Sequence, residues 1–133
     1  MKSFSKPAKT VMIVEEQKLL ADLLVEAITE ETPYKVVCVS SGAQALHLVG
    51  SLHPDLLIVS DRLADLSGLA LYDRIQEHME HRIIPMILLR VHKRERGIGD
   101  RQIFELNLPF DLDALFGWIE CLFWQGYSMS VCS

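Results

Sequence analysis

Short β-branched and aliphatic runs alternate along the chain with longer amphipathic stretches. The runs that predict strands are TVMIV (10–14), KVVCV (35–39), DLLIV (55–59), PMILL (85–89) and, more weakly, QIFEL (102–106). Nearly continuous apolar runs of this length are typical of strands that are buried on both faces, as in a parallel sheet covered by helices. The alternation therefore predicts an α/β fold.

Between these runs, apolar residues recur at helical spacing. Residues 16–31 predict a helix whose buried face would hold Leu19, Leu20, Leu23, Leu24, Ala27 and Ile28. Ser40 or Ser41 can cap a second helix that ends near Leu52, and a third is expected from about Ser67 to Met79. The last helix begins near 111, with the stripe Leu112, Leu115, Phe116, Ile119, Leu122 and Phe123.

The length and composition limit the class of protein. The 133 residues suffice for one buried core and are too few for two ordinary domains, so we expect a single domain over 1–133. Residues 1–9 are expected to be a frayed lead-in without the apolar stretch of a secretory signal, and 125–133 a tail. No run approaches the roughly 18 to 20 apolar residues of a membrane helix, so the sequence favours a soluble protein. The net charge of −5 gives no general reason to expect nucleic acid.

Cysteine and histidine spacing gives no metal signature. Cys38, Cys121 and Cys132 form neither an even set nor a CxxC pair, which favours reduced thiols in a cytoplasm. His78 and His81 lie three residues apart without a third ligand, which is weak evidence for zinc. We therefore expect neither metal nor cofactor.

Five motifs occur in an order that resembles the receiver domain of bacterial two-component response regulators. They are VMIVEEQ (11–17), SSGAQAL (40–46), PDLLIVSDRLADLSGLAL (54–71), IPMILL (84–89) and LPFDLDALFGWI (108–119). The resemblance covers roughly residues 9–124 and implies a doubly wound, five-stranded parallel sheet of the flavodoxin-like type. Its fourth helix is expected to be shortened or disordered, because the segment is short for the family and Gly97 and Gly99 disfavour a long helix.

The resemblance also implies where a phosphorylation site would lie. In that family a histidine kinase transfers a phosphoryl group to a carboxylate at the end of the third strand. An acidic pair holds magnesium beside that carboxylate, and a hydroxyl and a lysine complete the site. Matched residue by residue, the acidic pair falls on Glu15 and Glu16, the acceptor on Ser60, the hydroxyl on Arg90 and the lysine on Leu108. Only the acidic pair keeps its charge, which predicts a degenerate pocket.

Each departure removes a requirement of the reaction. Ser60 cannot form an acyl phosphate, and its hydroxyl is a weak nucleophile without a base. Asp61 follows one residue later and should point away, because side chains alternate along a strand, unless a bulge restores it. Arg90 would weaken a magnesium site, and we expect it to pair with Glu15 or Glu16 instead. In a simpler interpretation the two glutamates merely begin a helix.

The segment RVHKRERGIGDR (90–101) is the second informative stretch. It carries five of the thirteen basic residues, including Lys93, Arg94 and Arg96. A solvated loop is the simplest interpretation; a contact for an acidic protein surface comes next, and an anionic ligand or nucleic acid is a minor alternative.

The end of the final helix suggests an interaction surface. Cys121 and Trp124 lie roughly opposite the apolar stripe, Trp118 lies at its flank, and Tyr127 follows in the tail. A contiguous exposed aromatic patch would need a cover, either the tail or another copy of the chain.

The sequence therefore favours a phosphorylation-independent, receiver-like protein-interaction module in bacterial signalling. Such a module is a cytoplasmic non-enzyme that acts by binding a protein partner or a second copy of the chain, and a homodimer would form through the final helix and tail. The alternative is a phosphoacceptor that uses Asp61 with Glu15, Glu16 and a divalent metal. Neither the partner nor the output is encoded in any motif.

Overall fold

The structure is a computed structural model that describes residues 9–79, 82–90, 101–108 and 110–124. Its strands are β1 (Thr10–Val14), β2 (Lys35–Val39), β3 (Leu56–Ser60), β4 (Met86–Arg90) and β5 (Ile103–Asn107). Its helices are α1 (Lys18–Glu31), α2 (Gly42–Leu52), α3 (Gly68–His78) and α4 (Leu112–Trp124). All the strand pairs are parallel, in the order β2-β1-β3-β4-β5, which confirms the predicted flavodoxin-like sheet.

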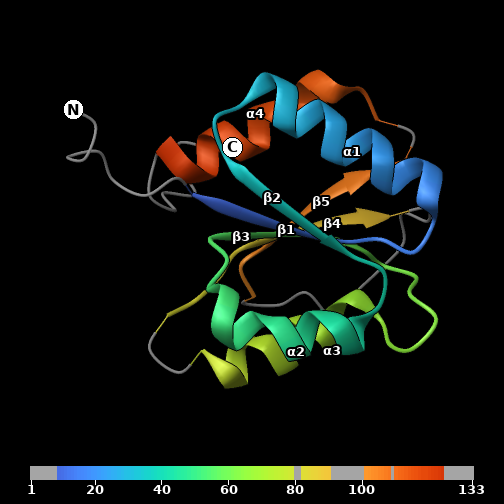
Figure 1. Ribbon diagram of the computed structural model, residues 1–133, viewed down its shortest axis with the longest axis vertical. Helices are drawn as coiled ribbons and strands as arrows, with labels where there is room; N and C mark the ends of the chain where they lie inside the picture. The colour runs from blue at the N-terminus through green and yellow to red at the C-terminus, as the bar shows by residue number, and fades with distance from the viewer. Residues whose placement is uncertain (1–8, 80–81, 91–100, 109, 125–133) are drawn as a thin grey trace.

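The sheet separates two layers of helices, with α1 and α4 on one face and α2 and α3 on the other (Figure 1). Alternation along each strand divides the buried side chains between these layers. In β1, Val11 and Ile13 pack under α1 and α4, whereas Met12 and Val14 pack under α2 and α3. The face on which a polar residue lies therefore follows from its place in the strand.

Three strands lie one residue later than the sequence predicted. The apolar runs 55–59, 85–89 and 102–106 become strands at 56–60, 86–90 and 103–107. Ser60 and Arg90 are consequently the last residues of their strands rather than the first residues of loops. The fourth-helix segment 91–100, the lead-in 1–8 and the tail 125–133 lie outside the described residues.

Two serines begin the helices of the second layer. The Ser41 hydroxyl accepts a hydrogen bond from the Gln44 amide at 3.1 Å, and the Ser67 hydroxyl accepts one from the Ala70 amide at 3.1 Å. The predicted cap at Ser41 is therefore confirmed.

Helix α1 differs from its predicted burial. Its buried residues are Ala21, Leu24, Ala27 and Ile28. Leu19 and Leu23, predicted to be buried, are 87% and 48% exposed. The apolar stripe read from the sequence was too wide, because the face centred on Leu24 and Ile28 turns Leu19 and Leu23 away from the sheet.

The cysteines also differ from expectation. Cys38 is a free thiol, but Cys121 is disulfide-bonded, so the expectation of reduced thiols is wrong at Cys121. An odd number of cysteines therefore does not exclude a disulfide. In the described part of the chain, no helix combines the length and the apolar composition that crossing a membrane requires.

Candidate functional site

The polar positions singled out in the sequence come together at the carboxyl edge of the sheet. Glu15 follows β1, Ser60 ends β3, Arg90 ends β4, and Leu108 follows β5. Parallel strands place all their carboxyl ends at one edge, where ligands bind in open α/β sheets. The contacts of each residue decide what this edge can do.

Glu15 is a buried acid with few partners. Its side chain is 4% exposed, and its Oε2 accepts a hydrogen bond from the Gln17 amide at 3.0 Å. Its Oε1 is buried without a hydrogen-bond partner among the described residues. Burial raises the pKa of Glu15, and the charge of Glu16 raises it further, against the lowering effects of the Gln17 amide and the Ser60 hydroxyl. The neutral form is therefore favoured more than in an ordinary glutamate.

Glu16 holds the loop between β3 and α3. Its Oε1 accepts a hydrogen bond from the Ala64 amide at 2.8 Å. The same loop is fixed again at Asp65, whose two oxygens accept from the Gly42 and Ala43 amides at 3.1 and 2.9 Å. These bonds to the first turn of α2 lower the pKa of Asp65. The second acid of the pair thus already has a structural partner.

The end of β3 is regular. Ser60 lies opposite Leu89 in the register, and the Asp61 amide continues the ladder by donating to the Leu89 carbonyl at 3.0 Å. No bulge interrupts β3 over these residues, so alternation places the Ser60 and Asp61 side chains on opposite sides. Ser60 follows Leu56 and Ile58 toward α1 and α4, the side on which Glu15 lies, and its hydroxyl lowers the pKa of Glu15. Asp61 has one buried oxygen, Oδ1, without a hydrogen-bond partner among the described residues.

Arg90 is buried on the opposite face from Glu15. It is 1% exposed, and its Nε lies 3.4 Å from Oε2 of Glu105 on the neighbouring strand β5. The predicted pairing with Glu15 or Glu16 is therefore wrong. Alternation explains the error, because Arg90 follows Met86 and Leu88 toward α2 and α3, whereas Glu15 follows Val11 and Ile13 toward α1 and α4.

Leu108 contributes only its backbone to this edge. Its amide donates to the Arg90 carbonyl at 2.6 Å, which extends the β4–β5 pairing. A leucine has no charge with which to hold a phosphoryl group.

Within the described ranges, no three or more His, Cys, Asp or Glu side chains lie close enough together to hold a metal ion.

The predicted interaction surface is only partly described. Lys93, Arg94, Arg96 and Tyr127 lie outside the described residues, as does the side chain of Trp124. Trp118 is half-buried and lies against Phe104 of β5, with the ring centroids 4.8 Å apart. Much of this indole is therefore covered by its own domain.

Sequence reasoning missed two residues that shape this edge. Glu105 is a lone charge inside the apolar run QIFEL, and such a charge signals a buried partner. Asp65 bonds to amides 22 and 23 residues earlier in the chain, and no local pattern reports such a contact.

Comparison with known proteins agrees with this architecture. Residues 11–99 match the response regulator receiver domain family, to which the chain therefore belongs. It is 37% identical over 79 residues to the polar-differentiation response regulator DivK of Brucella ovis, which covers 59% of this chain and 63% of that protein. The corresponding protein of Brucella anthropi is 34% identical over the same shares. The chain thus matches less than two thirds of the length of these relatives.

Solved structures share the fold. A response regulator receiver domain protein from Bacillus halodurans is 25% identical, with a TM-score of 0.74 over 86% of this chain and 96% of that one. A receiver domain from Methylobacillus flagellatus is 21% identical, with a TM-score of 0.78 over 87% and 99%. Receiver domains are modules of two-component signalling, and this chain is a member of that class.

Proposed function

We propose that the protein is a phosphorylation-independent receiver domain, a cytoplasmic module that acts by binding a protein partner and not by catalysis. One observation carries the proposal. At the end of β3, the side chain that alternation places on the same side of the sheet as Glu15 is the hydroxyl of Ser60, and the strand is regular there. A carboxylate is absent from the place where the acidic pair could help it to accept a phosphoryl group.

The neighbouring groups support the same conclusion. Glu15 is disfavoured as an anion by burial, and Glu16 is bonded to the loop amide of Ala64. Magnesium prefers several oxygen ligands in octahedral geometry, and these two acids would have to give up their present environment to supply them. Leu108 stands where the family has its lysine, so no cation is available there to bind the phosphoryl oxygens.

A small-molecule phosphodonor tests the proposal. The protein is incubated with acetyl phosphate and magnesium and examined by intact mass, beside a receiver domain that has a complete site. We expect no phosphoryl adduct on this protein, and no rise in its melting temperature with beryllofluoride and magnesium.

The matched variant for this test is Asp61→Asn. An adduct on the wild type that is lost in Asp61→Asn would establish the alternative, a phosphoacceptor built from Asp61, Glu15, Glu16 and a metal. The proposed function would then be wrong.

Self-association through α4 and the tail is a second part of the proposal. Its anchor would be Trp124, because Trp118 already packs on Phe104. Truncating an aromatic anchor typically costs about 2 kcal/mol, so Trp124→Ala should raise a dimer's Kd more than roughly tenfold. Sedimentation across a concentration series measures this, and a wild-type monomer throughout would exclude the dimer.

A further inference from the structure

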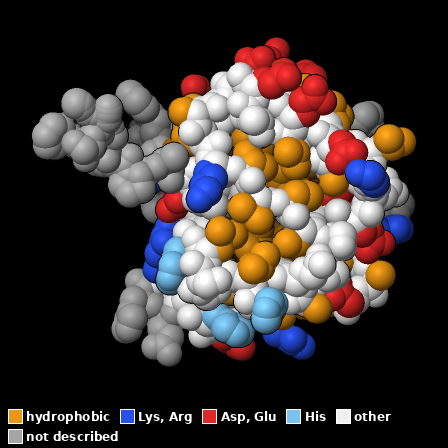
Figure 2. Space-filling view, viewed as in Figure 1, with side chains coloured by type: hydrophobic (Ala, Val, Ile, Leu, Met, Phe, Trp, Pro, Cys, Tyr) orange, Lys and Arg blue, Asp and Glu red, His pale blue; other side chains and the backbone are white. Residues whose placement is uncertain are grey.

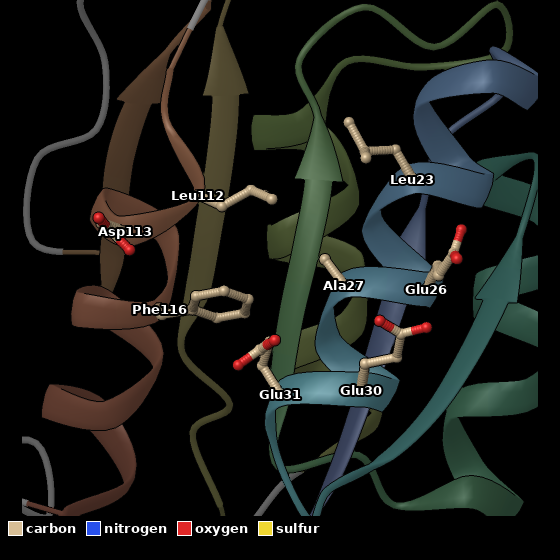
Figure 3. Close-up of a pocket in the computed structure, with 8 residues that line it drawn as sticks. All are labelled: Leu23, Glu26, Ala27, Glu30, Glu31, Leu112, Asp113 and Phe116. Carbon is tan, nitrogen blue, oxygen red and sulfur yellow. The ribbon is translucent and has the colours of Figure 1, made fainter.

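A groove runs between α1 and α4 on the outer face of one helical layer (Figure 3). It has a volume of about 540 Å³ and is lined by Leu23, Glu26, Ala27, Glu30, Glu31, Leu112, Asp113 and Phe116. A second hollow of about 370 Å³ shares Glu31, Asp113 and Phe116 with it and reaches Glu120. Together they form one continuous surface, the α1–α4 groove.

The floor of the α1–α4 groove is apolar. Leu112 and Phe116 extend from α4 toward α1, where Leu23 and Ala27 face them (Figure 3). Leu23 is 48% exposed, and Leu19, one turn earlier on α1, is 87% exposed. Residues four apart share a helix face, so the two leucines continue the apolar floor beyond the groove.

The rim of the groove is acidic. Among the described residues that line the two hollows, five are carboxylates and none is lysine or arginine; the carboxylates are Glu26, Glu30, Glu31, Asp113 and Glu120. Acidic side chains gather over α1 at the top of the molecule in the view of Figure 2. The surface therefore combines an apolar floor with charge of a single sign.

This charge is unfavourable for α1 itself. Glu26 and Glu30 are four residues apart on the helix, a spacing at which like charges repel. Glu30 and Glu31 lie in the last turn, where the helix dipole disfavours anions, and that turn has no basic residue. A cation bound at the groove would relieve both penalties. The residues that destabilise α1 are therefore the same residues that a positively charged partner would contact.

We propose that the α1–α4 groove binds a basic amphipathic helix of a partner protein. The apolar side of that helix would cover Leu19, Leu23 and Phe116, and its lysines or arginines would face the acidic rim. This inference deepens the proposed function and rests on it in one respect, that the contact forms without a phosphoryl group.

Charge complementarity selects this occupant. A second copy placed by twofold symmetry would bring the five carboxylates against their own counterparts. Nucleic acid and anionic membranes would be repelled for the same reason. A basic helix supplies the apolar area and the missing positive charge together.

The probe is a fluorescein-labelled peptide of leucine, alanine and lysine that forms an amphipathic helix of about five turns. Its control is a scrambled peptide of the same composition without an apolar face. We expect saturable binding of the amphipathic peptide by fluorescence anisotropy, with an affinity that falls as salt rises.

Two protein variants make the site specific. Glu30→Lys should weaken binding about fivefold or more, since it reverses a charge on the rim. Its matched control is Glu77→Lys, which makes the same change at an exposed position in the last turn of α3 and should bind as the wild type does. Leu23→Ser, which truncates the floor, should also weaken binding. Cooperative urea unfolding with midpoints close to or above that of the wild type would show that the variants are folded.

Several results would overturn the inference. They are no binding of the amphipathic peptide, equal binding of the scrambled peptide, or equal weakening by Glu30→Lys and Glu77→Lys. A dimer that Leu23→Ser dissociates would show that a second copy fills the groove. Titrations with and without acetyl phosphate and magnesium separate the two proposals: binding that appears only with the phosphodonor contradicts phosphorylation independence, whereas failure in both arms contradicts the groove alone.

Discussion

The carboxyl edge of the sheet and the α1–α4 groove both contain charged side chains, but these are buried at the edge and exposed in the groove. At the edge, Glu15 and Arg90 are 4% and 1% exposed. In the groove, Glu26, Glu30 and Glu31 are all exposed. The charged side chains at the edge therefore interact within the protein, whereas those of the groove face the solvent.

This difference indicates where the protein can interact. A phosphorylation site needs carboxylates that are free to bind metal, yet Glu16 holds the Ala64 amide and Arg90 is paired with Glu105. Changes at the edge should consequently alter stability, whereas changes in the groove should alter binding and leave stability nearly unchanged.

A large loss of stability is expected on replacement of Arg90. Replacing it by alanine would leave a buried space and deprive Glu105 of its ion pair, which typically costs about 3 to 5 kcal/mol for a buried pair. Glu105 keeps some solvent contact, at 32% exposure, so the lower end of that range is expected. Urea unfolding at neutral pH measures the loss.

The control for Arg90→Ala is Lys18→Ala. Lys18 pairs with Asp22 at 3.2 Å, with side chains 84% and 63% exposed, and such a surface pair contributes about 0 to 1 kcal/mol. Equal losses in the two variants would contradict the description of Arg90 as an internal charge.

A pair of leucines on α1 tests the same contrast within one helix. Leu24 is fully buried, and Leu24→Ala should cost about 2 to 5 kcal/mol. Leu19 is 87% exposed, and Leu19→Ala should stay within about 0.5 kcal/mol. Thermal or urea unfolding of both variants decides between the observed burial and the wider stripe read from the sequence. A large loss for Leu19→Ala would restore the wider stripe.

Replacement of Gly68, at the carboxyl edge of the sheet, should have a smaller effect on stability. A Cβ there would clash with Cδ1 of Leu88, which is fully buried, and would lie 3.4 Å from the Asp61 Cα. Gly68→Ala should therefore cost about 1 to 3 kcal/mol through overpacking. Gly50→Ala in α2 is the matched change, because a Cβ there meets nothing within 4 Å, and it should stabilise the helix by up to about 1 kcal/mol. If Gly68→Ala and Gly50→Ala changed the stability in the same direction, the packing around Gly68 would be able to accommodate the added methyl group.

Most of the fold could be predicted from the sequence, because local patterns encode it. The apolar runs and helical spacing place each described element within two residues of its bounds, and Ser41 caps α2 as expected. The degenerate site could be located as well, because parallel strands bring their ends to one edge. What failed was the direction of single side chains.

Those failures have physical causes. The partner of Arg90 depends on strand alternation, which the sequence offered, and on the residue-by-residue register between β4 and β5, which it did not. The exposure of Leu19 and Leu23 depends on how α1 rests on the sheet, and a helical periodicity with six apolar positions allows more than one orientation. The acidic groove arises from two helices about 80 residues apart, so only the assembled fold reveals it.

The smallest effect, and the one most specific to the edge, is the pH dependence of Glu15→Gln. Burial raises the pKa of Glu15 above its ordinary 4.5, so its neutral form favours folding. That stability is fully present below the unfolded pKa and is lost as the pH rises through the folded pKa. Glutamine stays neutral and keeps an oxygen for the Gln17 amide, so the variant should exceed the wild type in stability at neutral pH and match it near pH 4, about the unfolded value.

Asp65→Asn should show the opposite trend, which makes it the control for Glu15→Gln. Hydrogen bonds from the Gly42 and Ala43 amides lower the pKa of Asp65 below its ordinary 3.8. The stability it contributes is present above the unfolded pKa and is lost as the pH falls through the folded one, so Asp65→Asn should destabilise most at neutral pH. Urea midpoints of both variants across a pH series test the pair. If Glu15→Gln were destabilising at neutral pH, the ionised form of Glu15 would be in use, and the edge would have to be reconsidered as a site that binds a cation.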